Sequence, residues 1–299
     1  MRLTNQTFTL KMAMSSFTSK EKFHINHRLT EKENLPLYFK RIIVTSPRNY
    51  ASSLIAILTE KGAKAIWLPS IEISPLEDYT ILDKAIKNIS SYDWIAFTSR
   101  NGIEAFFNRL ETLKLSIDEV FCKIKTCAIG ADSRGLEERG IKATLIPKES
   151  SPRGIIEELS KMGVKKEKFL LPVPEVVGLS EPYVVPDFIN GLKEIGMITE
   201  KVPAYKTSSI TSGNELEKQM ILEKNVDMIA ITSSTEIESL LSIMGEKRDT
   251  LNDIPFAIMG PYTGKTAKDR GLNVKVMPEK NFSSFYDFVS AIEDYFKSI

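Results

Sequence analysis

The feature that most constrains the fold is a repeat inside the chain. Asp93 to Gly102 reads DWIAFTSRNG and Asp227 to Glu236 reads DMIAITSSTE, so one pattern of apolar run, hydroxyl residues and helix start occurs twice. A second pair of segments, 128–140 and 258–271, matches with one residue inserted. Repetition of this kind indicates two copies of one structural unit. With one copy in each domain, we expect the ligand site to lie between the two domains.

Each copy alternates short apolar runs with longer stretches of helical periodicity. The β-branched run at 41–46 predicts a buried strand, and the apolar spacing at 52–62 predicts the helix that follows it. Further along the chain, 94–99 and 143–147 read as strands and 133–140 as a short helix. Regular alternation of this kind is typical of parallel sheets with helices on both faces. The predicted fold class is therefore α/β.

Length and charge exclude several function classes. The chain has 299 residues, which suits two domains, and its net charge is +1. A field of one sign, as nucleic-acid or acidic-membrane binding requires, is therefore not expected. No apolar run approaches the roughly 20 residues that span a bilayer. We expect a soluble protein that binds neither nucleic acid nor a membrane.

Metal-ligating residue types are scarce. The two cysteines, Cys122 and Cys127, form neither a disulfide framework nor a paired-cysteine zinc site. The two histidines, His24 and His27, both precede the first predicted strand. If that segment lies outside the fold, the folded body has no imidazole base and no His-ligated metal. Its chemistry must then use hydroxyl groups, carboxylates, Lys, Arg or backbone amides.

The stretch 259–266, MGPYTGKT, follows an apolar run and resembles a phosphate-binding loop. Such a loop needs four residues between its first glycine and the Gly-Lys pair, and only three are present. The matching stretch of the other copy has no Gly-Lys pair. The two copies share only Gly-x-x-Ser/Thr, which is Gly130 with Ser133 and Gly260 with Thr263. We therefore predict no nucleotide loop here.

Hydroxyl side chains recur where predicted strands end and helices begin. A glycine turn or a hydroxyl at a helix start leaves backbone N–H groups free to bind an anion. For any one of these positions, simple capping of a helix by Ser or Thr is the more ordinary explanation. Their recurrence in a two-domain repeat favours an anion-binding cleft. The positions are Thr45, Ser46, Ser99, Asn101, Gly102, Ser133, Ser233, Ser234 and Thr263.

Taken in order, several segments resemble the uroporphyrinogen-III synthase family. They are VTSPR near the start, DWIAFTSRNGIEAF, AIGADSRGLEERG, VPAYKT and AIMGPYTGKTAKDRG. The resemblance covers nearly all of the chain after residue 39. It implies two flavodoxin-like domains joined by a two-stranded linker, with crossings near 69–75 and 202–208. The implied division is a first domain of 40–72 with 207–299 and a second domain of 73–206.

The family converts the linear hydroxymethylbilane into uroporphyrinogen III, with inversion of ring D and loss of water, and uses no metal or cofactor. By resemblance, Tyr205 is the proton donor for the leaving hydroxyl. A core tyrosine on a strand edge is the alternative. Ser99, Ser233, Ser133 and Thr263 match family hydroxyls that, with nearby backbone amides, bind the substrate's carboxylates. Charged side chains such as Arg48, Arg100 and Lys265 are more typical of solvated surface.

The chain departs from the family pattern in two places. Ser133 stands where the family usually has Thr, which keeps the hydroxyl. The segment 170–192 is longer and richer in proline than usual, and its Glu175 and Glu181 would repel a polycarboxylate. This leaves open a non-catalytic tetrapyrrole- or anion-binding relative. A two-domain receptor or a nucleotide-sugar enzyme would predict a secretory signal or a nucleotide motif, and neither is found.

The first 39 residues are expected to be an extension of the fold. Residues 1–20 are rich in Ser and Thr, hold three basic residues and lack acids, which suits an organelle transit peptide. An ordinary disordered tail is the alternative. With the resemblance, a transit peptide implies the plastid stroma, ahead of mitochondrion or cytosol. We further expect a monomer in transient contact with hydroxymethylbilane synthase.

Overall fold

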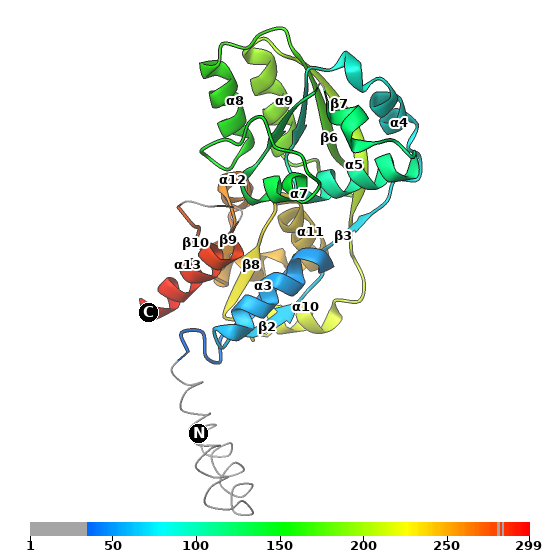
Figure 1. Ribbon diagram of the computed structural model, residues 1–299. Helices are drawn as coiled ribbons and strands as arrows, with labels where there is room; N and C mark the ends of the chain where they lie inside the picture. The colour runs from blue at the N-terminus through cyan, green and yellow to red at the C-terminus, as the bar shows by residue number, and fades with distance from the viewer. Residues whose placement is uncertain (1–34, 123, 280–281, 283) are drawn as a thin grey trace, which may run out of the picture.

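The computed structural model describes residues 35–122, 124–279, 282 and 284–299. They form two α/β domains that lie one above the other in Figure 1, each built on one five-stranded sheet. The predicted extension lies almost entirely outside the described residues, and so do His24 and His27.

The first domain contains the sheet with strand order β10-β9-β8-β1-β2, in which every recorded pair is parallel. Numbered along the chain within this sheet, the order is 2-1-3-4-5, which is the flavodoxin-like order. The strands are β1 (Arg41–Val44), β2 (Lys64–Trp67), β8 (Met228–Ile231), β9 (Phe256–Ile258) and β10 (Val274–Val276). The helices are α3 (Arg48–Glu60), α10 (Glu215–Leu222), α11 (Ser234–Met244), η3 (Gly245–Asp253), α12 (Pro261–Asp269) and α13 (Phe285–Lys297).

The second domain contains the sheet with order β3-β7-β6-β4-β5. Without β3, its four parallel strands follow the order 2-1-3-4 when they are numbered along the chain within this sheet. The repeated segments equate β4 with β8 and β5 with β9, and in each sheet these two strands are parallel neighbours. The strands are β3 (Ile71–Ser74), β4 (Trp94–Phe97), β5 (Lys125–Ala128), β6 (Lys168–Val177) and β7 (Ile198–Ser209). The helices are α4 (Thr80–Lys87), η1 (Ile89–Ser91), α5 (Arg100–Thr112), α6 (Ile117–Phe121), η2 (Gly130–Ser133), α7 (Arg134–Glu137), α8 (Pro152–Lys161) and α9 (Val184–Glu194).

Two extended segments connect the domains. β3 pairs antiparallel with the end of β7, from Ile71 opposite Ser209 to Ser74 opposite Lys206. The chain thus leaves the first domain along β3 and returns along β7, as Figure 1 shows. The predicted α/β class and two-stranded linker are confirmed. The domain boundaries by residue remain a prediction.

Both faces of each sheet are covered because the strands are apolar on both sides. In β4 all four residues are buried, and their side chains alternate between two clusters. Phe97 packs on one face with Phe106 of α5, whereas Trp94 stacks with Phe169 of β6 on the other. Continuous apolar runs are what strands buried on both faces require. The strand ends are thereby held rigidly, and the helices that follow them begin at fixed points.

The expected strand at 143–147 is wrong as a full strand. Only an isolated bridge between Leu145 and Cys127 is present there. At the neighbouring position, Thr126 and Thr144 each donate a backbone N–H to the other's hydroxyl, at 3.1 and 3.2 Å. Side-chain hydroxyls thus replace the backbone carbonyls of a regular ladder. The helix expected at 133–140 is likewise shortened to α7, preceded by the 3₁₀ turn η2.

Candidate functional site

Two helices begin in the same way at equivalent positions of the repeat. Ser99 caps α5 by accepting a hydrogen bond from the Gly102 N–H at 3.1 Å, and Ser233 caps α11 by accepting one from the Glu236 N–H at 3.4 Å. Both serines have the extended backbone that an N-cap requires. Each helix start therefore lies at the carboxyl end of a central strand, where open α/β sheets bind ligands.

Tyr205 of β7 lies against the first of these helix starts. Its hydroxyl is 3.1 Å from the Ser99 Oγ. A side-chain carbon on Gly102 would lie 3.9 Å from the tyrosine ring and 3.3 Å from the Pro172 carbonyl oxygen, so a small residue leaves room for the ring. Burial raises the pKa of Tyr205 to about 12, although the Ser99 hydrogen bond acts in the opposite direction. The phenol therefore stays protonated at neutral pH and is able to donate a hydrogen bond.

A cavity of about 360 Å³ opens beside Tyr205. Its wall combines helices α3 and α5 with the linker strands β3 and β7, so both domains contribute to it. Asn49 of α3 donates an amide hydrogen bond of 3.0 Å to Asn101 of α5 across the domain boundary. Pockets of about 300–1,000 Å³ are typical of small-molecule sites. This is the place where Tyr205, Asn101 and a helix start meet.

At the equivalent place in the first domain, the Glu236 carboxylate occupies the helix start. Thr45 and Thr232 donate hydroxyl hydrogen bonds to it, each of 2.6 Å. Ser233 and Ser46 donate further bonds of 3.0 and 3.4 Å, and the Thr232 N–H adds one of 3.1 Å. Glu236 is 1% exposed, and this burial raises the pKa of its carboxyl group. The hydroxyls gathered here bind a carboxylate of the protein itself.

The predicted site residues thus fall into separate groups in the described structure. Asn101, Ser99 and Gly102 lie with Tyr205, whereas Thr45, Ser46 and Ser233 surround Glu236. Ser133 is buried at the end of η2, and Thr263 is buried in α12. Ser234 accepts a hydrogen bond of 3.0 Å from the Thr266 hydroxyl. A direct role of each residue in ligand binding stays a prediction.

The family model described as "Uroporphyrinogen-III synthase HemD" matches residues 52–284. The chain belongs to the uroporphyrinogen-III synthase family. It is 26% identical over 240 residues to the uroporphyrinogen-III synthase of Synechococcus elongatus, covering 78% of this chain and 88% of that one. Membership of the family places the chain in porphyrin biosynthesis.

Two further proteins resemble this chain, one in sequence and one in structure. The porphyrin biosynthesis protein HemD of Ruminiclostridium josui is 26% identical over 84% of this chain, which spans only 48% of that protein's length. A mutant uroporphyrinogen III synthase from Thermus thermophilus superposes with a TM-score of 0.63 at 14% identity, over 87% of this chain and 100% of that one. This likeness confirms the two-domain fold.

Sequence reasoning missed two carboxylates of this synthase-family chain. Asp132 lies in η2, between the strand end and Ser133, and its Oδ1 is 3.7 Å from the Arg100 Nε. Glu236 could have been found, because Ser233-x-x-Glu236 has the spacing of a helix capping box. Asp132 gave no comparable signal. In both copies, a carboxylate of the protein lies at the helix start where anion binding was predicted.

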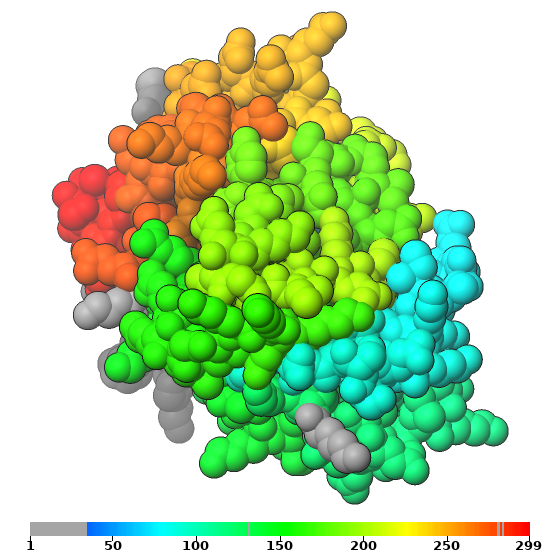
Figure 2. Space-filling view, turned by 90° about the horizontal axis from the view of Figure 1, so that it is seen from above, coloured from blue at the N-terminus to red at the C-terminus, as the bar shows by residue number. Residues whose placement is uncertain are grey.

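The segment 170–192, which departs from the family pattern, contributes a contact between the domains. It continues as β6 and then, after a short loop, as α9. Asp187 of α9 lies 3.6 Å from Lys265 of α12, and the Lys265 ammonium lies over the Tyr183 ring at 4.6 Å. In Figure 2 the orange atoms of the first domain adjoin the green atoms of the second. Glu181 is paired with Lys201, which reduces the repulsion expected from it.

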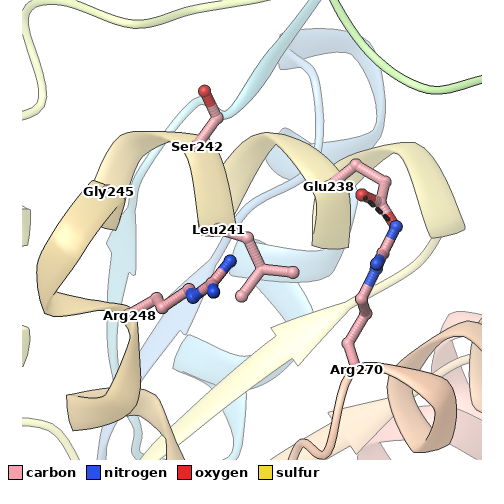
Figure 3. A pocket seen from close by; sticks show the side chains of 6 residues that line it. All are labelled: Glu238, Leu241, Ser242, Gly245, Arg248 and Arg270. Atoms are coloured by element: carbon pink, nitrogen blue, oxygen red, sulfur yellow. Dashed lines mark hydrogen bonds and ion pairs between the residues drawn. The ribbon is translucent and has the colours of Figure 1, made fainter.

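A second cavity, of about 420 Å³, lies along α11 and η3, far along the helix from its start (Figure 3). Arg270 forms two bonds of 2.9 and 3.0 Å with Glu238 across one end of it. Of the described residues that line it, none was predicted as a site residue. Glu238 neutralises the charge of Arg270, which is one of the two arginines that line this second cavity. We therefore place the candidate site at Tyr205.

The part of the chain that the structure describes holds neither a candidate metal cluster nor a candidate membrane-spanning helix. There, no group of three or more His, Cys, Asp or Glu side chains is placed to hold a metal ion. The same ranges contain no helix long and apolar enough to cross a bilayer. The expectation that the reaction needs no cofactor stays a prediction.

Proposed function

We propose that this protein is a uroporphyrinogen-III synthase, a cyclising hydro-lyase. It converts linear hydroxymethylbilane into uroporphyrinogen III, inverting ring D and releasing water. The observation that carries the proposal is the Tyr205 hydroxyl, held by Ser99 at a helix start and facing a cavity shared by both domains. A protonated phenol at this place can supply the acid that the leaving hydroxyl needs.

The reaction requires two things of the protein, which are a proton for the leaving hydroxyl and a fixed geometry of the substrate. Pyrrole rings supply the electrons that expel the hydroxyl, so the protein must donate a hydrogen bond or proton to that oxygen. Tyr205 is suited to this because burial keeps its phenol protonated. Holding the chain folded so that the inverted ring attacks then suppresses the spontaneous uninverted closure.

Substrate binding needs donors for carboxylates and a cleft that opens. Asn49 and Asn101 carry amide groups on both walls of the cavity, which runs along the side of α5 from Asn101 to Thr112. A cavity of about 360 Å³ is small for a linear tetrapyrrole. We therefore propose that the domains separate along the thin linker to admit the substrate.

A coupled assay tests the proposal. Hydroxymethylbilane is generated in place by its synthase, this protein is added, and the oxidised products are separated into isomers I and III. We expect isomer III well above the control without protein. Isomer I alone would reject the enzymatic function and leave a non-catalytic tetrapyrrole-binding relative, which binding of the product to the same protein would then test.

Composition and family membership support further proposals on location, oligomeric state, cofactor and partner. We propose that residues 1–39 direct the protein to the plastid stroma, that it acts as a monomer without cofactor, and that it contacts hydroxymethylbilane synthase transiently. A reporter fused to residues 1–39 should accumulate in plastids, and a cytosolic reporter would reject this location. Light scattering of the purified protein tests the monomer.

A further inference from the structure

Arg109 of α5 lines the Tyr205 cavity, and its guanidinium is held on two sides. Its Nε donates to the Asp83 Oδ1 at 2.5 Å, and its Nη2 donates to the Asp83 Oδ2 at 2.6 Å. The same guanidinium lies over the Tyr79 ring, 4.4 Å from the ring centroid. Two bonds to a carboxylate and one stacked ring fix the orientation of this planar group.

An ion pair that ties α4 to α5 is the ordinary explanation of these bonds, but it uses only part of the guanidinium. Arginine carries five N–H donors. Asp83 accepts from Nε and Nη2, whereas Nη1 makes no hydrogen bond within the part of the chain that the structure describes. Arg109 lines the cavity and Asp83 does not. The unused donors therefore lie on an edge that Asp83 leaves uncovered, on a residue of the cavity wall.

Arg109 is the only cation among the described residues that line this cavity. The other charged residue of the lining is Glu104, whose carboxylate accepts a hydrogen bond of 2.7 Å from Arg139. Asp83 balances much of the Arg109 charge, so what Arg109 offers a ligand is donors in a fixed position. A guanidinium edge with two parallel N–H groups matches the two oxygens of a carboxylate.

The position of Arg109 along α5 places these donors away from Tyr205. Tyr205 contacts Ser99 at the start of the helix. Arg109 follows Asn101 by eight residues, which corresponds to about 12 Å along the helix axis. A carboxylate at Arg109 therefore belongs to a part of the ligand that is remote from the group facing Tyr205.

We propose that Arg109 binds a side-chain carboxylate of the substrate, on a ring remote from the leaving hydroxyl. This inference rests on the proposed function, under which the ligand is a linear tetrapyrrole that carries several carboxylates. Nη1 and the second N–H of Nη2 donate to the two carboxylate oxygens. A remote contact of this kind is equally strong before and during the reaction. It therefore lowers KM and leaves kcat almost unchanged.

The test compares Asp83→Asn with the double variant Asp83→Asn/Arg109→Gln. Both lack the ion pair and neither leaves a carboxylate without its partner, so they differ only in the Arg109 charge and donors. KM and kcat for isomer III are measured from initial rates over a range of hydroxymethylbilane concentrations. Asp83→Asn should have a KM no higher than wild type, because Arg109 then has no internal counter-charge. The double variant should have a KM about 10-fold or more above that of Asp83→Asn, with kcat within a few-fold.

The chain offers a matched control in the first domain. Arg270 binds Glu238 through the same two atoms, Nε and Nη2, at 2.9 and 3.0 Å, and both residues line the second cavity (Figure 3). Glu238→Gln and Glu238→Gln/Arg270→Gln should have the same KM. A rise in KM in this double variant as large as that in the Arg109 variant would overturn the inference, because any loss of positive charge would then explain both.

The remaining outcomes separate this inference from the proposed function. Equal KM values in the two Asp83 variants would mean that the pair only joins α4 to α5. Should the double variant not fold by circular dichroism, Arg109→Lys decides, because it keeps the charge and lacks the forked donors. A wild-type KM in Arg109→Lys would overturn the inference.

If the wild type makes only isomer I, the proposed synthase function fails, and binding decides on Arg109. Titration calorimetry with uroporphyrinogen III then compares the two Asp83 variants. A dissociation constant about 10-fold or more higher in the double variant supports a carboxylate site at Arg109. Equal dissociation constants overturn it.

Discussion

The two copies of the repeat begin their central helices with the same serine cap but differ three residues later. In the second domain that residue is Gly102, and the space beside it is taken by the Tyr205 ring. In the first domain it is Glu236, whose carboxylate accepts the hydroxyl hydrogen bonds of its surroundings. One copy therefore presents a phenol to a cavity, whereas the other satisfies its polar groups internally.

Under the proposed function, this difference makes the second copy of the repeat the reactive one. The strand, the serine cap and the helix start are common to both copies, so they supply position rather than chemistry. A single residue at the third helical position determines whether a neighbouring side chain can approach the cap. We accordingly expect changes in the second domain to reduce activity and changes in the first to reduce stability.

The largest effect should come from Tyr205→Phe. Loss of the phenolic hydroxyl removes the proposed acid, and general acids contribute about 10²–10⁴-fold to rate. We expect kcat for isomer III to fall within that range. The free energy of unfolding should fall by only about 1 kcal/mol, because one hydrogen bond to Ser99 is lost.

Tyr79→Phe is the matched control for this change. Tyr79 lines the same cavity, and its hydroxyl accepts a hydrogen bond of 3.2 Å from the Leu76 N–H. The control should lose similar stability while keeping kcat within a few-fold of wild type. Equal losses of kcat in the two variants would mean that the cavity needs packed aromatic rings with hydroxyls rather than an acid at Tyr205.

Glu236 is the next largest test, with stability as the readout. Glu236→Ala should lower the free energy of unfolding by about 3 kcal/mol, because several buried donors lose their acceptor. Its kcat, measured well below the melting temperature, should change far less than that of Tyr205→Phe. Stability that stays within about 0.5 kcal/mol of wild type would mean that water replaces the carboxylate.

The pH dependence of Glu236→Gln sharpens the same point. Burial raises the folded-state pKa of Glu236 above the unfolded value of about 4.3, so its ionisation costs stability as pH rises past that value. The amide cannot ionise, and the variant escapes this cost. Its melting temperature relative to wild type should therefore increase from about pH 4 upward. A difference that is constant with pH would show that folding leaves the pKa of Glu236 unshifted.

Much of this organisation is predictable from residues alone. The alternation of apolar runs with helical stretches predicted the α/β class, because a continuous apolar run such as β4 must be buried on both faces. The resemblance to the family added the flavodoxin-like strand order and the two-stranded linker. The predicted strand at 143–147 was wrong because the backbone N–H groups of Thr126 and Thr144 donate to each other's hydroxyl groups and not to backbone carbonyls. This pairing depends on how the two segments are aligned, which the sequence does not give.

The site was predicted as a list of residue types, but the grouping of those residues was not. A serine that caps a helix and a serine that binds a ligand have the same sequence signature. Which serine faces Tyr205 depends on long-range contacts, between residues 106 positions apart in the case of Ser99. Asp132 was missed for a similar reason, because its contact with Arg100 joins two segments that are distant in the chain.

The two caps should differ in their contribution to stability. Ser99→Ala should cost about 1 kcal/mol, the usual loss of an N-cap. Ser233→Ala should cost about 2 kcal/mol, because it also removes a donor to the buried Glu236 carboxylate. Urea unfolding of both variants measures the difference. Ser99→Ala should also lower kcat several-fold through Tyr205, whereas a larger kcat loss in Ser233→Ala would reverse the assignment of the reactive copy.

The smallest effect is expected at Gly102, the helix position at which the two copies differ in sequence. In Gly102→Ala, the added methyl group would lie 3.3 Å from the Pro172 carbonyl oxygen and 3.4 Å from the Ser99 Oγ. This crowding offsets the gain in helix propensity of up to about 1 kcal/mol, so stability should change by about 0.5 kcal/mol or less. The methyl group also comes within 3.9 Å of the Tyr205 ring, and kcat should fall by a few-fold.

Gly135→Ala in α7 provides the comparison, because its methyl group would meet Ile103 at 3.4 Å in a similarly tight contact. Its stability should change about as little, and its kcat should stay that of wild type. If Gly102→Ala loses activity by more than about 10²-fold, the backbone at Gly102 must itself contact the substrate. The difference between the copies would then lie in a binding surface that Glu236 blocks in the first domain, rather than in access to Tyr205 alone.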